Sequence, residues 1–217
     1  SNSHLIKLGN LSPQTVEIRG HDYLVYSEEL LSGPDLMTII KQGERPALEE
    51  LVELALACLR VIQALWGMGY IHRDIKPANI IRTSETERRY VLLDLGIAFK
   101  IHGTQLTASG QTIGTRLYMP PELFSPDYKR IIDFRSDIYS MGVTLFQFAS
   151  GFPPLVRRPE DEFTTVYRIL KQRPEKLETH RNDLPTHFCR FVDRCIRKQP
   201  ALRYADLDSL IRELEDM

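Results

Sequence analysis

Cysteines and long apolar runs are both scarce in this 217-residue chain. Its three cysteines, Cys58, Cys189 and Cys195, form neither a paired framework nor a CxxC metal-binding pattern. They are therefore expected to pack in the core of a protein kept in a reducing compartment. The most apolar stretch, residues 48–66, is interrupted by charged side chains and falls short of the roughly 20 apolar residues that a bilayer span needs.

An excess of charge of one sign is also missing. The formal net charge is −1 and the sequence pI about 6.6, with acidic and basic residues interspersed. No basic face predicts nucleic-acid binding, and no acidic tail predicts disorder. The first residues lack the basic and apolar regions of a signal peptide. These features predict a cytoplasmic protein of one compact domain, with no nucleic-acid partner and no membrane contact.

The chain opens with a pattern typical of short strands and then changes to helical periodicity. Strands are expected at residues 4–8, 15–19 and 23–26, separated by turns that contain glycine, asparagine and aspartate. Ser32-Gly33-Pro34 ends this part, and Asp35 is a plausible N-cap for a first helix. Glycine, threonine and serine in residues 100–114 predict a loop.

Most of the remaining chain has the apolar spacing of helices. A long amphipathic helix is expected from Leu48 to about Gly67, with Trp66 in the core. Residues 80–81 and 90–93 flank a polar turn and predict a hairpin. A nearly all-apolar helix over 136–150 should be buried on most sides. Further helices are predicted at residues 163–171, 188–197 and 207–217.

Residues 72–79 carry the most specific chemical signal. They read His72-Arg73-Asp74-Ile75-Lys76-Pro77-Ala78-Asn79 and match the pattern H-R-D-x-K-x-x-N at every defined position. This segment resembles the catalytic loop of eukaryotic-type serine/threonine protein kinases. Three further motifs follow in the order of that family: Asp94-Leu95-Gly96, Gly114-Thr115 and Pro120-Pro121-Glu122. The resemblance implies an α+β, mainly α fold, that of the large C-terminal lobe of a kinase.

The resemblance also implies a role for each matching residue. Asp74 would orient the acceptor hydroxyl and take its proton, while Lys76 would steady the γ-phosphate of ATP. Asn79 and Asp94 would hold Mg²⁺, which prefers oxygen ligands. Thr115 would hydrogen-bond near Asp74 and Lys76, and the implied cofactors are therefore ATP and Mg²⁺.

Other matching residues are expected to support the site. Glu122 would form an ion pair with Arg203, and Asp137 would brace the backbone of the catalytic loop. His72 is expected to be a packed core residue and not a catalyst. Arg73 would pair with a phosphate on the activation segment. Candidate positions for that phosphate are Thr104, Thr107, Ser109 and Thr112.

Residues 1–31 resemble a remnant of the kinase small lobe and the hinge, and residues 32–217 the large helical lobe. Glu29 to Leu31 would be the hinge segment whose backbone meets adenine. The glycine-rich loop and the ATP-anchoring lysine are missing, Leu95 replaces phenylalanine, and Pro120 replaces alanine.

Three readings of the missing small-lobe parts remain open. In the first, the chain is a piece of a full kinase. In the second, it is a short kinase completed by a partner chain or by homodimerisation. In the third, it is a pseudokinase-like scaffold. The leading hypothesis is a serine/threonine kinase that transfers the γ-phosphate of ATP to a protein substrate. The alternative is a catalytically impaired regulatory binding module.

Overall fold

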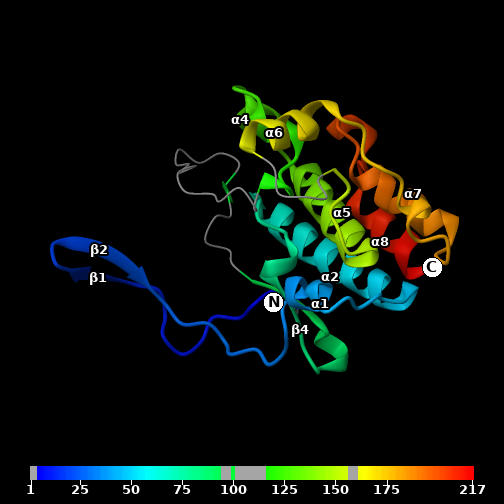
Figure 1. Ribbon diagram of the computed structural model, residues 1–217. Helices are drawn as coiled ribbons and strands as arrows, with labels where there is room; N and C mark the ends of the chain where they lie inside the picture. The colour runs from blue at the N-terminus through cyan, green and yellow to red at the C-terminus, as the bar shows by residue number, and fades with distance from the viewer. Residues whose placement is uncertain (1–3, 94–98, 101–115, 156–160) are drawn as a thin grey trace.

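The computed structural model describes residues 4–93, 99–100, 116–155 and 161–217. Figure 1 shows a body of packed helices, from which a two-stranded hairpin projects to one side. The strands of the described residues are short and pair antiparallel. The predicted mainly helical α+β architecture is therefore confirmed.

The projecting hairpin consists of β1 (Gln14–Ile18) and β2 (His21–Val25). It confirms two of the predicted strands, with shifted ends. Arg19 and Gly20 connect them with positive φ angles of 52° and 78°. Two successive positive φ values suit the right-handed twist of a tight hairpin, which explains the glycine at the turn.

The strand predicted for residues 4–8 is wrong. This segment makes only isolated bridges, from Leu5 to Leu92 and from Leu8 to Glu28. The backbone N–H of Leu92 donates to His4 O, and that of Ile6 donates to Leu92 O. The segment pairs with two separate parts of the chain in turn and runs beside neither long enough to form a ladder. Its apolar alternation therefore gave a false strand signal.

The first two helices follow the predicted pattern. Helix α1 (Leu36–Lys41) begins at Asp35, whose Oδ1 accepts the N–H of Thr38 at 2.9 Å, and this confirms the predicted N-cap. Helix α2 (Leu48–Gly67) buries its apolar stripe against α5 and α8. It ends before Gly69, which has a φ of 79°.

Short elements connect α2 to the rest of the core. Strand β3 (Tyr70–Ile71) pairs with β6 (Phe99–Lys100), and β4 (Ile80–Arg82) pairs with β5 (Tyr90–Leu92), as the predicted hairpin requires. Two single-turn 3₁₀ helices frame β4 in sequence, η1 (Pro77–Asn79) before it and η2 (Thr86–Arg88) after it. The chain between β3 and β4 therefore forms a short loop that contains residues 72–76.

Helix α5 (Phe134–Ser150) lies at the centre of the molecule, between α2 and α7 (Figure 1). Its side chains from Ser136 to Ala149 are buried, which confirms the predicted core helix. The helix starts two residues earlier than expected because Asp133 caps it by accepting the N–H of Arg135 at 2.8 Å. It ends at Gly151, whose φ of 87° is left-handed.

The C-terminal half consists of α6 (Glu162–Lys171), α7 (Thr186–Cys195) and α8 (Leu207–Glu215), close to the predicted ranges. The turns η4 (Leu177–Thr179) and η5 (Pro200–Leu202) separate them. The short elements η3 (Pro121–Phe124) and α4 (Tyr128–Ile131) precede α5. Helices α1, α2, α5, α7 and α8 share one hydrophobic core.

Two sequence expectations about single residues have different outcomes. The three cysteines are buried and unpaired, as predicted. Trp66 is 36% exposed, so its predicted place in the core is wrong. It lies on the outer face of the last turn of α2, where its ring contacts Phe134 at a centroid distance of 5.2 Å.

In the described residues, no helix is both long and apolar enough to cross a membrane.

Candidate active site

The loop between β3 and β4 brings three of the predicted site residues together. Asp74 Oδ2 accepts hydrogen bonds from Lys76 Nζ and from Asn79 Nδ2, each at 2.7 Å. Asn79 Nδ2 also donates to the backbone oxygen of Asp74 at 3.1 Å. Asp74 is buried and the other two are partly buried. One carboxylate is thus fixed by an ammonium group and an amide.

The local fold explains why residues five positions apart meet. Pro77 starts η1, and the N–H of Asn79 donates to Lys76 O at 2.9 Å. This single turn folds Asn79 back toward Asp74. Because Asn79 presents its amide nitrogen to Asp74, its Oδ1 is the atom that can bind a cation.

Helix α5 fixes the start of the loop. Asp137 Oδ2 accepts the backbone N–H of His72 at 2.7 Å, and Asp137 Oδ1 accepts that of Arg73 at 2.8 Å. Arg73 has a φ of 69°, so the chain turns sharply just before Asp74. Burial raises the pKa of Asp137, while His72 and the two backbone N–H groups act in the opposite direction.

His72 is fully buried, as expected of a packed residue. Its Nδ1 lies 3.4 Å from the backbone nitrogen of Asp74, a long contact. Arg73 is partly buried, and burial lowers its pKa while Tyr128 and Asp137 raise it. The structure therefore puts both residues at the base of the loop, beside Asp74.

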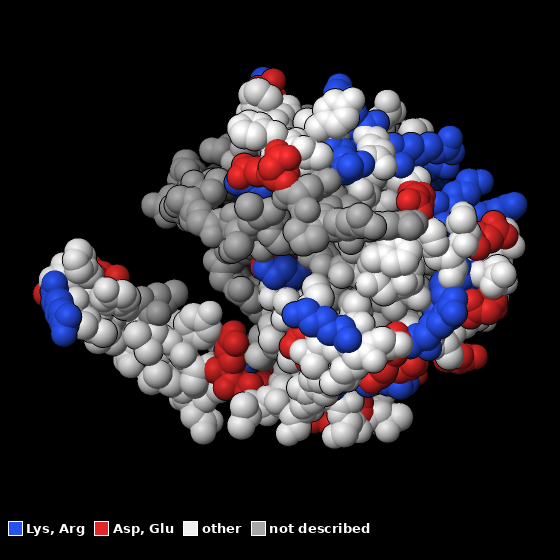
Figure 2. Space-filling view, in the orientation of Figure 1, with Lys and Arg blue, Asp and Glu red and all other residues white. Residues whose placement is uncertain are grey.

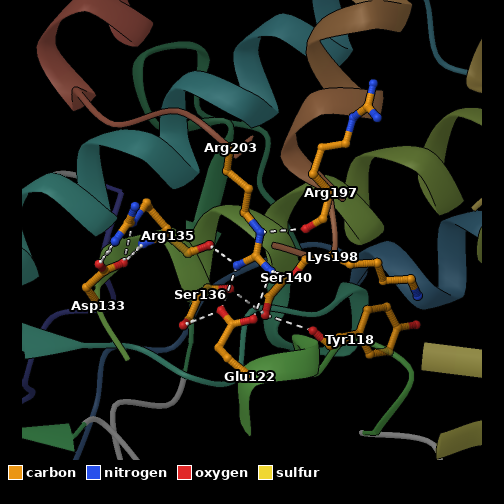
Figure 3. Close-up of polar contacts among 9 residues, drawn as sticks. All are labelled: Tyr118, Glu122, Asp133, Arg135, Ser136, Ser140, Arg197, Lys198 and Arg203. Carbon is orange, nitrogen blue, oxygen red and sulfur yellow. Dashed lines mark hydrogen bonds and ion pairs between the residues drawn. The ribbon is translucent and has the colours of Figure 1, made fainter. Parts of the chain in front are cut away.

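A second polar cluster anchors η3 to the C-terminal part of the chain (Figure 3). Arg203 Nη1 lies 2.6 Å from Glu122 Oε1, and Arg203 Nη2 lies 2.8 Å from Glu122 Oε2. Ser136 Oγ also donates to Glu122 Oε1, at 2.8 Å. The backbone oxygens of Arg135, Arg197 and Lys198 accept the remaining guanidinium hydrogens. Every polar atom of this buried pair is therefore used, which buried charge requires.

The predicted hinge residue Glu29 has a partner that the sequence did not reveal. Its carboxylate accepts two hydrogen bonds from Arg88, one of them 2.8 Å long, and the N–H of Lys7 donates to it at 2.8 Å. The bond to Arg88 lowers the pKa of Glu29 to about 2. Leu31 is partly buried. The side chain of Glu29 thus joins the segment before α1 to the β4–β5 connection.

Several predicted residues lie outside the described part of the chain: Asp94, Leu95, Gly96, Thr104, Thr107, Ser109, Thr112, Gly114 and Thr115. The nearest described neighbour of Asp94 in the sequence is Leu93, whose N–H donates to Asn79 O at 2.8 Å. Within the described residues, no group of three or more His, Cys, Asp or Glu side chains could hold a metal ion.

Sequence reasoning missed Ser136 and Arg88. Ser136 immediately precedes Asp137 at the start of α5, and its contact with Glu122 could have been suspected from that position. Arg88 lies in a polar turn, residues 83–89, with several charged neighbours, and no spacing rule distinguishes it from them. Its partner Glu29 is 59 positions away.

The chain belongs to the protein kinase domain family, whose family model matches residues 4–213. It is 30% identical to the serine/threonine-protein kinase PknA of Mycobacterium tuberculosis over 183 residues, which are 84% of this chain and 39% of PknA. It is also 30% identical to PknE of the same species over 194 residues, 89% of this chain and 32% of PknE. The chain thus spans well under half of these relatives.

A solved structure shows the same fold. The kinase domain of M. tuberculosis PknI, in a mutant form, matches with a TM-score of 0.67 and 21% sequence identity. The match covers 99% of this chain and 71% of the PknI chain. At this identity the likeness concerns the fold alone, and it agrees with the α+β, mainly helical architecture described above.

Proposed function

We propose that the chain is the large lobe of a serine/threonine protein kinase, which transfers the γ-phosphate of ATP to a hydroxyl group of a protein substrate. The observation that carries this proposal is the contact of Asp74 with both Lys76 and Asn79 in a loop braced by Asp137. Membership of the protein kinase domain family supports it. Clustered carboxylate, ammonium and amide groups are the parts that phosphoryl transfer uses.

Asp74 is the group to which we assign the acceptor hydroxyl. Its Oδ2 accepts from both Lys76 and Asn79, so Oδ1 is the oxygen directed to the substrate. There it orients the hydroxyl and receives its proton as the oxygen attacks phosphorus. Lys76, held 2.7 Å from Asp74, donates to the transferred phosphoryl group, and Thr115 helps to position both residues.

The donors available suit a hard cation. Asn79 Oδ1 and the carboxylate of Asp94 are the oxygen ligands that we assign to Mg²⁺. When bound, this ion neutralises charge on the phosphates of ATP. We assign the adenine contact to the backbone between Glu29 and Leu31, where the Glu29–Arg88 ion pair restrains the chain. The guanidinium of Arg73 would pair with a phosphate group carried by the activation segment.

We divide the chain into residues 1–31, belonging to a small lobe, and residues 32–217, the large lobe. In the described residues, β1 and β2 pair only with each other. Ile18 and Tyr23 on this hairpin are 50% and 49% exposed, and a two-stranded hairpin is marginally stable alone. We propose that a further segment or a partner chain completes the small lobe here.

The cysteines favour a cytoplasmic location for this protein. All three are buried and unpaired, which fits a reducing compartment.

The test of catalysis uses the full-length protein and radiolabelled ATP. Asp74→Asn should abolish phosphate incorporation and leave the circular dichroism spectrum unchanged, because the substitution is nearly isosteric. The matched control is Asp216→Asn, an exposed aspartate at the end of α8, which should keep full activity. Undiminished incorporation by Asp74→Asn would refute the role given to this residue.

A second measurement separates catalysis from a binding module that retains the fold. Mg-ATP should raise the melting temperature of the wild-type full-length protein, since ligand binding stabilises the folded state by mass action. The shift should vanish in Asp94→Ala. No shift in the wild type would instead support the regulatory binding module.

A further inference from the structure

Basic side chains gather on a part of the large lobe that the proposed active site does not use. Two adjoining hollows, of about 290 and 690 Å³, lie between the end of α6, α7 and η5. Six exposed basic residues line them: Lys171, Arg173, Lys176, Arg190, Arg194 and Arg197. We call this surface the basic groove. Figure 2 shows blue side chains over the corresponding region, where Figure 1 places the end of α6 and α7.

The carboxylates of the basic groove offset only part of its positive charge. The two acidic residues among those lining it are Glu175 and Asp193. Glu175 Oε2 lies 2.6 Å from His180 Nε2, and Asp193 Oδ1 accepts the N–H of Leu177 at 3.0 Å. Two carboxylates therefore face six exposed cations, and burial raises the pKa of Asp193 while the charges of Lys176 and Arg197 oppose that rise. Within the described residues, Lys171, Arg173, Lys176 and Arg190 form no ion pair.

Two of the basic residues that line the groove are held in place by contacts within the fold, and Arg194 keeps its charge available in doing so. The guanidinium of Arg194 lies 4.1 Å from the centroid of the Tyr204 ring. Lys198, which also lines the groove, donates from Nζ to the backbone oxygens of Arg168 and Ile169 at the end of α6. The side chain of Arg197 extends away from the Glu122–Arg203 cluster in Figure 3, although its backbone oxygen belongs to that cluster. Preorganised charges bind an anion at lower entropic cost.

The basic groove also has an apolar part. Leu202 in η5 lines both hollows and is 54% exposed, a large fraction for a leucine among charged side chains. No aromatic side chain is among the described residues that line the groove. Single-stranded nucleic acid binds by stacking bases on aromatic rings, so the lining favours a peptide. An acidic peptide with one apolar side chain would match both the charge and Leu202.

We propose that the basic groove is a docking site for an acidic, extended segment of a partner protein, with one apolar side chain placed over Leu202. The groove shares no lining residue with the loop of residues 72–79. Peptide binding there can therefore be measured separately from phosphoryl transfer, and a failure of one proposal is distinguishable from a failure of the other. Complementary charge at such a surface mainly gives specificity and fast association.

The test uses the full-length protein and a fluorescein-labelled, glutamate-rich peptide of about ten residues with one central leucine. Fluorescence anisotropy should show binding that weakens as salt rises, because the contacts are exposed. The triple variant Lys176→Glu/Arg190→Glu/Arg197→Glu should bind at least tenfold more weakly. A matched control with the same charge change, Arg19→Glu/Lys41→Glu/Arg212→Glu, reverses exposed cations elsewhere and should bind like the wild type.

A second variant guards against a folding defect. Leu202→Ser removes exposed apolar surface without changing charge. It should lower the affinity for the peptide severalfold while the circular dichroism spectrum stays unchanged. Three results would overturn the proposal: no binding of the peptide by the wild type, equal weakening in the two triple variants, or tighter binding of a single-stranded DNA oligonucleotide of equal charge. The last result would assign the groove to nucleic acid.

Discussion

Glu122 and Arg203 lie 81 positions apart in the sequence and form a fully hydrogen-bonded, buried ion pair (Figure 3). The pair joins η3, just ahead of α4, to the turn that precedes α8. This ion pair therefore fixes η3 to the C-terminal part of the helical core.

Removing one partner of this pair should be severely destabilising. Arg203→Ala leaves the carboxylate of Glu122 buried and uncompensated, so we expect the free energy of unfolding to fall by about 3–5 kcal/mol. Urea denaturation followed by circular dichroism measures it. Arg212→Ala, an exposed arginine on α8, is the control and should change stability by no more than about 0.5 kcal/mol. Equal effects in the two variants would contradict the assigned role.

Asp137→Asn should loosen the catalytic loop. Asparagine offers one acceptor oxygen where Asp137 uses two, and its amide N–H₂ would face a backbone N–H. We expect a loss of about 1–3 kcal/mol of stability, the cost of a buried unsatisfied group. Hydrogen exchange should be faster at the amides of His72 and Arg73 in particular. Unchanged protection of those two amides would rule out the bracing contact.

Gly33→Ala should destabilise the junction between the N-terminal segment and β4. Gly33 has a φ of 142°, and a Cβ placed on it would lie 2.0 Å from Arg82 O. We expect a loss of about 1–3 kcal/mol or more, from backbone strain and the clash. Gly43→Ala is the matched control, since its φ is also positive, at 78°, but open space surrounds it. Thermal melts of the two variants should therefore differ, with Gly33→Ala lower.

The Glu29–Arg88 ion pair predicts a specific pH dependence. Arg88 lowers the pKa of Glu29 from its ordinary value of 4.5 to about 2. A carboxyl whose pKa is lower in the folded state stabilises that state above the unfolded pKa and loses this effect as pH falls. Glu29→Gln should therefore cost a few tenths to about 1 kcal/mol at pH 6 and progressively less between about pH 4.5 and 2.

Urea titrations of wild type and Glu29→Gln at about pH 6 and about pH 3 measure this difference. The control is Glu17→Gln on the exposed strand β1, whose difference from the wild type should stay small at both pH values. A stability difference for Glu29→Gln that grows as the pH falls would contradict the ion pair.

Local sequence determined the elements whose signals are short-range. The Asp35 cap, the α2 stripe, the β4–β5 hairpin and the buried helix α5 all follow from patterns within one element. The catalytic-loop motif likewise predicted that Asp74, Lys76 and Asn79 would act together, and one 3₁₀ turn is enough to bring them into contact. These features depend on neighbours a few positions away, which the sequence displays directly.

Tertiary structure decided the features that depend on distant partners. Periodicity suggested a strand at residues 4–8, but only pairing partners make a ladder, and the segment has just isolated bridges. Trp66 is apolar by type, yet the face of α2 that it occupies points outward. A net charge of −1 gave no sign of the basic groove, because summing charges discards their positions. Folding alone brings Lys176, Arg190 and Arg197 to one surface, while most of the acidic residues lie elsewhere.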